Sequence, residues 1–218
     1  AGNWDVRSLP QAVDGAGNVY VADIGNNTIR KIIPSGAVST LAGLAGSRGS
    51  NVDGLGSAAR FSYPCGVAAD SAGNVYVRDE GNLTVRKITP DGEVTTLAGR
   101  AGVAGSSDGI GGAARFNYTD GGVAVDAAGN VYVADTNNNT IRKITPGGVV
   151  QTLAGQGWRN EGYSDGIGRN ACFSAPRGVA VDSVGRIYVA DTYNNTIRQG
   201  WLATAPAGLG ALLPFLAS

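Results

Sequence analysis

The sequence contains no histidine and no methionine, and it has only two cysteines, Cys65 and Cys172. Histidine is the commonest general acid–base residue and the commonest metal ligand, so its absence excludes the usual zinc sites and Ser–His nucleophiles. Two cysteines are too few for a disulfide framework, and we expect two separate thiols. We therefore predict no catalytic residue, no metal site and no cofactor.

An excess of charge of either sign is also missing. Lys and Arg total 17, Asp and Glu total 17, and the formal net charge is zero. Nucleic-acid-binding proteins usually carry a basic surface, so we predict no nucleic-acid partner. No apolar run approaches the roughly 20 residues that a membrane-spanning helix needs, so we predict no membrane span. The chain starts at Ala1 without methionine, which we interpret as a removed secretory signal and hence a secreted, extracellular protein.

Glycine is abundant, with 35 residues in 218, against a usual level of about 7%. No collagen period accompanies the excess, so we expect many tight turns. The chain is built from four copies of one motif, and internal repetition of this length is typical of repeat folds. The copies are GNVYVADIGNNTIRKI from Gly17, GNVYVRDEGNLTVRKI from Gly73, GNVYVADTNNNTIRKI from Gly129 and GRIYVADTYNNTIRQG from Gly185, 56 residues apart.

Each copy contains short runs rich in Val, Ile, Tyr and Thr, separated by turn residues such as Ala-Ala-Gly-Asn and Pro-Gly-Gly. Four antiparallel strands per copy describe the blade of a β-propeller, whose ring closure protects the sheet edges. We therefore predict an all-β fold: a single domain over 1–218 with four blades joined by long inter-blade loops. The predicted blades cover about 9–43, 64–99, 120–155 and 176–204.

The last copy shows no fourth strand after residues 196–199. We predict that the N-terminal segment 3–8 supplies this strand and closes the ring. The apolar tail 205–218 is the alternative, since it has the character of a docked strand, and a third possibility is that the chain is part of a larger ring.

The consensus GVAVDxxGNVYVADxxNNTIRKITPxGxVxTLAG resembles the NHL repeat over nearly the whole chain. The resemblance implies a β-propeller, usually of six blades, that presents a face or rim to a protein, RNA or another ligand. A minority of related six-bladed propellers are enzymes, namely a zinc-dependent amidating lyase that uses histidine ligands and calcium-dependent lactonases. This chain has four copies, each lengthened by a glycine-rich insert, and no histidine to match the lyase.

The glycine-rich inserts carry a second repeated motif, Asp-Gly-Ile/Leu-Gly, with a phenylalanine eight residues after the aspartate. It starts at Asp53, Asp108 and Asp165. A phosphate loop should precede a helix, and a calcium site needs six to eight oxygens, so neither chemistry suits a loop with one or two carboxylates. We predict a structural role in which the aspartate bonds nearby amides and the phenylalanine holds the loop on its blade.

Other polar residues recur in every copy. Asp23, Asp79, Asp135 and Asp191 precede the Asn-rich turn, and Arg30, Arg86, Arg142 and Arg198 follow seven residues later. We expect these aspartates to bond the turn and to pair with the arginines, at about 0.2–1 kcal/mol per pair where exposed. Asp14, Asp70, Asp126 and Asp182 end the first strand, and a ring of these carboxylates is the best metal hypothesis that the sequence offers.

The clearest departure from the repeat is the stretch 157–163. Its aromatic and polar side chains are predicted to bind a protein or glycan ligand, and they are Trp158, Arg159, Asn160, Glu161 and Tyr163. The competing interpretation is that Trp158 only covers a blade edge. The predicted function is a non-enzymatic binding module; the alternatives are a multivalent carbohydrate-binding protein and, third, a calcium-dependent hydrolase or lactonase.

Overall fold

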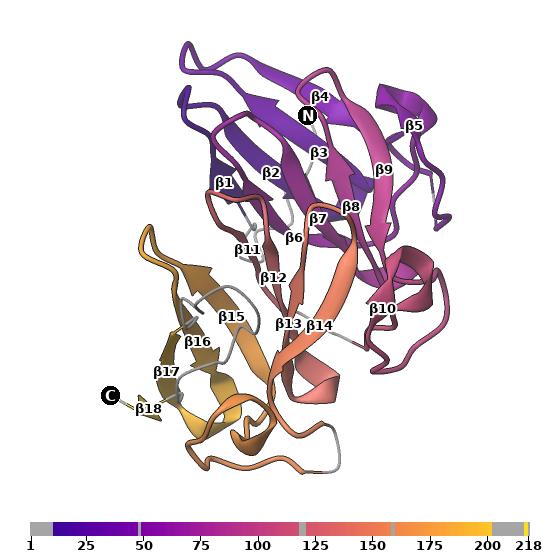
Figure 1. The fold of residues 1–218 in the computed structure, drawn as a ribbon. Helices are drawn as coiled ribbons and strands as arrows, with labels where there is room; N and C mark the ends of the chain where they lie inside the picture. Colours follow the sequence, from indigo (N-terminus) through magenta and orange to yellow (C-terminus); the bar gives the residue numbers. More distant parts are fainter. Residues whose placement is uncertain (1–10, 48, 118–120, 158–159, 202–215, 218) are drawn as a thin grey trace.

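The structure is a computed structural model that describes residues 11–47, 49–117, 121–157, 160–201 and 216–217. These residues form four antiparallel sheets that follow one another along the chain, as Figure 1 shows. The all-β fold of four NHL-like blades predicted from the repeat is thereby confirmed. The helices in the described ranges are single 3-10 turns, and none has the length or hydropathy to cross a membrane.

The first blade contains β1 (Gln11–Val13), β2 (Val19–Asp23), β3 (Thr28–Ile32) and β4 (Val38–Ala42). The second contains β6 (Pro64–Ala69), β7 (Val75–Asp79), β8 (Thr84–Ile88) and β9 (Glu93–Ala98). The third contains β11 (Val123–Val125), β12 (Val131–Asp135), β13 (Thr140–Ile144) and β14 (Val149–Ala154). The fourth contains β15 (Pro176–Val181), β16 (Arg186–Asp191), β17 (Thr196–Trp201) and β18 (Leu216–Ala217).

Two blades have five strands instead of the four predicted. The inter-blade loops add β5 (Gly54–Leu55) to the outer edge of the second blade and β10 (Gly109–Ile110) to that of the third. Gly54 pairs with Val94 and Gly109 with Val150. Each pair comes from the Asp-Gly-Ile/Leu-Gly motif, so the motif extends the sheet of the blade that follows it.

The strand beside β17 is β18, in which Leu216 pairs with Gln199 and Ala217 with Arg198. The apolar tail, named above as the alternative, thus contributes the strand at this position. The N-terminal segment 3–8, predicted for the same role, lies outside the described residues.

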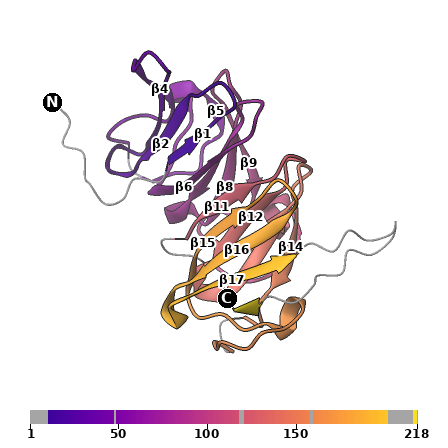
Figure 2. The ribbon, with the colours of Figure 1, turned by 90° about the vertical axis from the view of Figure 1, so that its left-hand side faces the viewer.

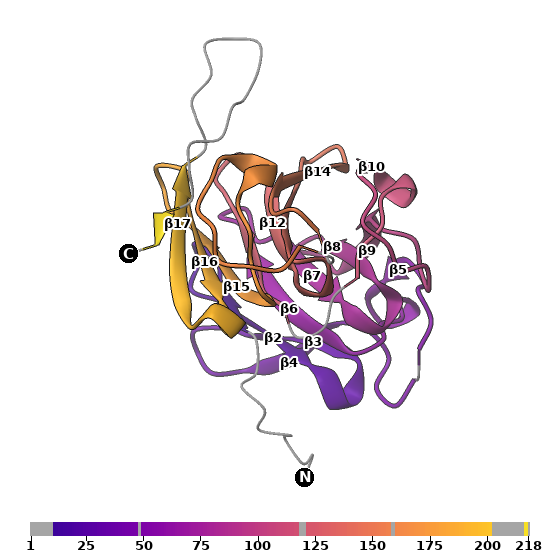
Figure 3. The same cartoon turned by 90° about the horizontal axis from the view of Figure 1, so that it is seen from below.

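Successive blades contact one another through their first two strands: β6 packs on β1 and β2, β11 on β6 and β7, and β15 on β11 and β12. Figure 3 shows the four sheets from below, and Figure 2 shows the first and fourth blades at opposite ends of the described molecule. No contact of comparable extent joins the first blade to the fourth among the described strands.

Three hydrophobic cores lie between successive blades, and each contains one phenylalanine from an inter-blade loop. Phe61, Phe116 and Phe173 are each at most 1% exposed. Phe116, for example, packs with Val85 of the second blade and Val133 of the third. This arrangement explains why strands such as β12 are buried on both faces: each central sheet is covered by a neighbour on either side.

The turn between the second and third strands of each blade is a single 3-10 turn: η1 (Ile24–Asn26), η3 (Glu80–Asn82), η5 (Thr136–Asn138) and η7 (Thr192–Asn194). The residue after each turn is left-handed, with φ between 52 and 57° at Asn27, Leu83, Asn139 and Asn195. Asparagine tolerates this conformation better than most residues because its short side chain bonds locally. The Asn-rich motif is therefore a turn signal.

Candidate binding face

The four 3-10 turns and the inter-blade loops lie at the same end of the blades, which we call the loop face. The turns are tied to the loops by backbone hydrogen bonds: the amide of Gly81 donates to Ser62, that of Asn137 to Asn117 and that of Tyr193 to Ser174. Because these hydrogen bonds hold the backbone of both turn and loop, the side chains that project from this face do so from fixed backbone positions.

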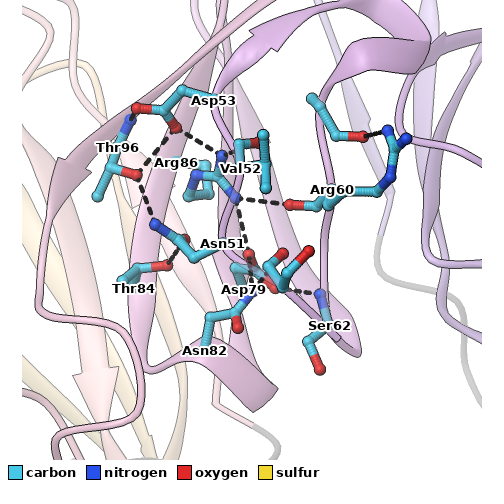
Figure 4. A network of polar contacts seen from close by, with 12 residues as sticks. Asn51, Val52, Asp53, Arg60, Ser62, Asp79, Asn82, Thr84, Arg86 and Thr96 are labelled. Atoms are coloured by element: carbon cyan, nitrogen blue, oxygen red, sulfur yellow. Dashed lines mark hydrogen bonds and ion pairs between the residues drawn. The ribbon is translucent and has the colours of Figure 1, made fainter. Parts of the chain in front are cut away.

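A buried ion-pair network supports the loop face in the second, third and fourth blades. In the second blade, Arg86 donates to Asp79 at 2.9 Å and to Asp53 at 2.6 Å (Figure 4). The side chains of Arg86 and Asp79 are fully buried. The guanidinium also donates to the carbonyls of Arg60 and Val52 and lies 5.1 Å from the ring centroid of Phe61.

The network recurs in the next two blades. Arg142 lies 2.7 Å from Asp135 and 2.9 Å from Asp108, and Arg198 lies 3.1 Å from Asp191 and 2.6 Å from Asp165. The Asp–Arg pairing predicted from the spacing of seven residues is thus present in these blades. The structure adds that the Asp of the Asp-Gly-Ile/Leu-Gly motif is the second partner of the same arginine, which explains the motif as a structural element.

Burial raises the pKa of Asp79 to about 6, although hydrogen bonds from Asn82 and Ser62 and the charge of Arg86 oppose this shift. Burial likewise raises the pKa of Asp135 to about 6, against the charge of Arg142. Hydrogen bonds and the arginine charges together keep these carboxylates ionised at neutral pH in a site where an isolated charge would be costly. In each pair both charges serve to join the loop to the blade.

The aspartates that were considered as a metal ring accept hydrogen bonds within their own blades. Asp14 accepts hydrogen bonds from the amides of Ala16 and Asn18, the side-chain amide of Asn18 and the hydroxyl of Tyr20. Asp70, Asp126 and Asp182 make the corresponding contacts with their own turns. Among the residues that the structure describes, no group of three or more His, Cys, Asp or Glu side chains is placed to hold a metal ion.

Two aromatic side chains of the fourth blade, Tyr193 and Tyr163, are largely exposed on the loop face. Tyr193, in η7, is 66% exposed, and the guanidinium of Arg177 lies 5.8 Å from its ring centroid. Tyr163, in the loop before η6 (Gly168–Asn170), is 82% exposed. The loop is held against η7 because the carbonyl of Gly162 accepts a hydrogen bond of 2.7 Å from Asn194.

The predicted ligand-binding stretch is therefore placed on this face, but only in part. Asn160, Glu161 and Tyr163 are described, the first two as exposed residues, with the amide of Asn160 donating to the carbonyl of Gly157. Trp158 and Arg159 lie outside the described residues. Sequence reasoning did not single out Tyr193 or Arg177, although Tyr193 replaces Gly25, Gly81 and Asn137 at the same position of the other copies.

A second group of polar side chains, which the sequence analysis did not identify, lies where the second and third blades meet. The guanidinium of Arg78 lies 2.9 Å from the sulfur of Cys65 and 3.3 Å from Glu80, and it is fully buried. Arg78 stands where the other copies have alanine, and this departure from the repeat is the sequence feature that could have identified it. Burial raises the pKa of the Cys65 thiol to about 12, so this thiol is not an activated nucleophile. Cys65 and Cys172 are both free, as expected.

Comparison with known proteins agrees with the repeat. A family model described as NHL repeat matches residues 121–144 and 173–199. The chain is 31% identical over 212 residues to Teneurin-3 of Danio rerio and 34% identical over 143 residues to NHL repeat-containing protein 2 of Bos taurus. These matches cover 86% and 58% of this chain but only 8% and 18% of the relatives.

Solved structures show the same fold. A structural genomics protein of unknown function from Bacteroides thetaiotaomicron is 27% identical with a TM-score of 0.69, and the match covers 88% of this chain and 46% of that one. An auxiliary nutrient binding protein from Bacteroides ovatus is 21% identical with a TM-score of 0.66, covering 95% and 48%. The chain thus spans about half the length of these structures. Repeat motif, family model and blade architecture agree, and the chain belongs to the NHL-repeat β-propeller family.

Proposed function

We propose that the protein is a non-enzymatic binding module that holds its ligand at the loop face of the fourth blade. The observation that carries the proposal is the exposure of Tyr163 and Tyr193, 82% and 66%, on backbone tied down by hydrogen bonds. The two tyrosines belong to one region, because Gly162, next to Tyr163, accepts a hydrogen bond from Asn194, next to Tyr193. The ligand we expect is a glycan or a protein segment.

The physical basis is the low cost of ordering such a surface. Tyrosine offers a flat apolar ring and a hydroxyl with few rotatable bonds, so binding gains contact area with little loss of side-chain entropy. Hydrogen bonds hold Gly162 and η7 in place before the ligand arrives, which lowers the cost of ordering the backbone. Arg177, Asn160 and Glu161 add directional hydrogen bonds around the rings.

The multivalent carbohydrate-binding alternative has less support at this face. Four equivalent sites need four equivalent side chains, whereas Gly25, Gly81, Asn137 and Tyr193 occupy one position of the repeat. A single glycan site on the fourth blade is compatible with the proposal. The calcium-dependent hydrolase is the weakest alternative because the inner aspartates are used by their own turns.

The test is a glycan-array screen of the whole protein, with calcium and with chelator, followed by capture of proteins from the source culture. For the ligand found, Tyr193→Ala and Tyr163→Ala should each weaken binding by at least about tenfold, as aromatic anchors do. Trp158→Ala tests the remaining part of the predicted stretch. Tyr63→Ala is the matched control, since Tyr63 is 64% exposed on the second blade. Equal binding by all variants would exclude the fourth-blade site.

The extracellular location expected from the sequence belongs to the same proposal. Fractionation of the producing cells tests it: the protein should appear in the medium or at the cell surface. Recovery in the cytosol alone would contradict it.

A further inference from the structure

Arg177 is a half-buried arginine for which the described part of the chain provides no counter-charge. It lies near the start of β15, with its guanidinium 5.8 Å from the ring centroid of Tyr193. Every other described arginine that is buried or half-buried makes at least one side-chain hydrogen bond or ion pair. Within the same ranges Arg177 makes neither. A partly desolvated cation in this position is a site that a bound anion would stabilise.

The second blade shows what accompanies an arginine at the corresponding place. Arg78 lies 3.3 Å from Glu80 and 2.9 Å from the sulfur of Cys65, and all three residues belong to that blade. Two repeat lengths later in the chain, Arg177 takes the position of Cys65 and Thr192 takes that of Glu80. The fourth blade therefore has an arginine at this place but a neutral threonine where the second blade has a carboxylate.

The environment of Arg177 and Tyr193 is set by the fourth blade itself. The turn position of Tyr193 is exposed in every copy, including the second and third blades, which have a neighbour on either side; its counterparts are Gly25, Gly81 and Asn137. The thiol of Cys65, at the position of Arg177, finds its hydrogen-bond partners within its own blade. The exposed ring and the missing carboxylate thus follow from the residues of the fourth blade.

Arg177 and Tyr193 are both departures from the repeat, and they meet in space. The other copies form the same turn with glycine or asparagine, so the fold does not require the tyrosine. Tyr163 belongs to the same region, because the carbonyl of Gly162 accepts a hydrogen bond of 2.7 Å from Asn194. Residues that a repeat does not need for folding, gathered on one surface, indicate a functional site.

We propose that this surface binds a glycan that carries carboxylate groups, with a carboxylate on Arg177 and a sugar ring stacked on Tyr193. This inference rests on the proposed function and names its ligand class. A guanidinium binds a carboxylate through two parallel hydrogen bonds, which gives both energy and orientation. The tyrosine rings supply flat apolar area beside a hydroxyl, which suits the apolar face and the hydroxyl groups of a sugar.

The other polar residues of the region favour an acidic glycan over an acidic peptide. Glu161 is exposed on the loop that carries Tyr163. A run of acidic residues would bring several carboxylates near Glu161 and be repelled by it. In a uronate glycan each carboxylate is accompanied by hydroxyl groups, with which the carboxylate of Glu161 and the amide of Asn160 can form hydrogen bonds.

Titration calorimetry of the whole protein with matched oligosaccharides tests the proposal. The probes are oligomers of galacturonate, glucuronate and mannuronate, each also prepared with its carboxylates reduced to hydroxymethyl groups. The wild type should bind at least one acidic oligomer about tenfold or more tighter than its reduced form. Arg177→Met should remove this difference. Arg169→Met is the matched control, because it removes a 61% exposed arginine of the preceding loop and should preserve the difference.

Thr192→Glu tests the same point without removing the arginine. It places a carboxylate where the second blade has Glu80, so the repeat already accommodates this side chain at this position. The new carboxylate should neutralise Arg177 and lower the affinity for the acidic oligomer to that for the reduced one. Unchanged preference for the acidic form in both Thr192→Glu and Arg177→Met would overturn the role of Arg177.

The remaining outcomes separate the ligand class from the site. Equal binding of acidic and reduced oligomers, weakened by Tyr193→Ala, would overturn the carboxylate and leave the proposed function standing. Binding of hexaglutamate without binding of any oligosaccharide would overturn the glycan in favour of an acidic peptide. Failure to bind every one of these probes would overturn the acidic glycan, and the capture of proteins described above then tests the proposed function separately.

Discussion

Nη1 of Arg142 lies 2.7 Å from Oδ2 of Asp135, and both side chains are fully buried between the blade and its loop. The two residues are seven positions apart on adjacent strands of one hairpin, whereas the other partner of Arg142, Asp108, comes from 34 residues earlier. A contact within one blade and a contact with the loop that precedes it thus share a single guanidinium.

Replacing Arg142 by methionine should cost about 3–5 kcal/mol in the free energy of unfolding, because Asp135 is left buried without its counter-charge. Arg30→Met is the matched control in the first blade, where the arginine is half-buried and bonds Thr40. We expect it to cost less than about 1 kcal/mol. Urea unfolding followed by circular dichroism measures both, and equal losses would show that the buried network contributes little.

Asp14→Asn should destabilise the protein at neutral pH, and the difference from the wild type should close on acidification. Burial raises the pKa of Asp14, but hydrogen bonds from Asn18 and Tyr20 outweigh it and hold the pKa at about 2. The unfolded value is about 3.9, so the stabilisation is present above that pH and is lost as the pH falls toward 2. Urea unfolding of both proteins between pH 2 and 6 tests this; a constant difference would contradict it.

Gly99→Ala should be more damaging than Gly102→Ala, although both glycines have positive φ, +95° and +72°. A Cβ at Gly99 would lie 2.5 Å from the carbonyl oxygen of Leu83, whereas a Cβ at Gly102 would meet nothing within 4 Å. We expect about 1–2 kcal/mol for Gly102→Ala from backbone strain. Gly99→Ala should cost about 1–3 kcal/mol more because the second blade must shift. Thermal and urea unfolding of the two variants give the comparison.

Cys65 should react slowly with a thiol reagent in the native protein, because its pKa of about 12 leaves almost no thiolate at pH 8. The comparison is between Cys172→Ser, which leaves Cys65 alone, and Cys65→Ser, which leaves the half-buried Cys172. Cys172 should be modified faster in the native state, and both thiols should react at the same rate in denaturant. Rapid modification of native Cys65 would mean that the contact with Arg78 and Glu80 opens readily.

Much of the fold was predictable because it is local. The period of 56 residues, the Val- and Tyr-rich runs such as Val131–Asp135 and the Asn-rich turns indicate the strands and turns of a blade directly. The candidate site was predictable only in part: the irregular stretch 157–163 was found because it breaks the repeat. Tyr193 was missed because it stands inside a well-matched copy, where one substitution draws little notice.

The sequence by itself determined the blade, since strand period, turn chemistry and repeat length are properties of neighbouring residues. Only the tertiary structure decided the contacts between residues that are far apart in the sequence. It buried the Asp–Arg pairs, used the motif aspartates Asp53, Asp108 and Asp165 as second partners of the same arginines, and placed β18 beside β17. It also decided which copies of a repeated side chain are buried, because burial is set by the neighbouring blade and cannot be read from the repeat itself.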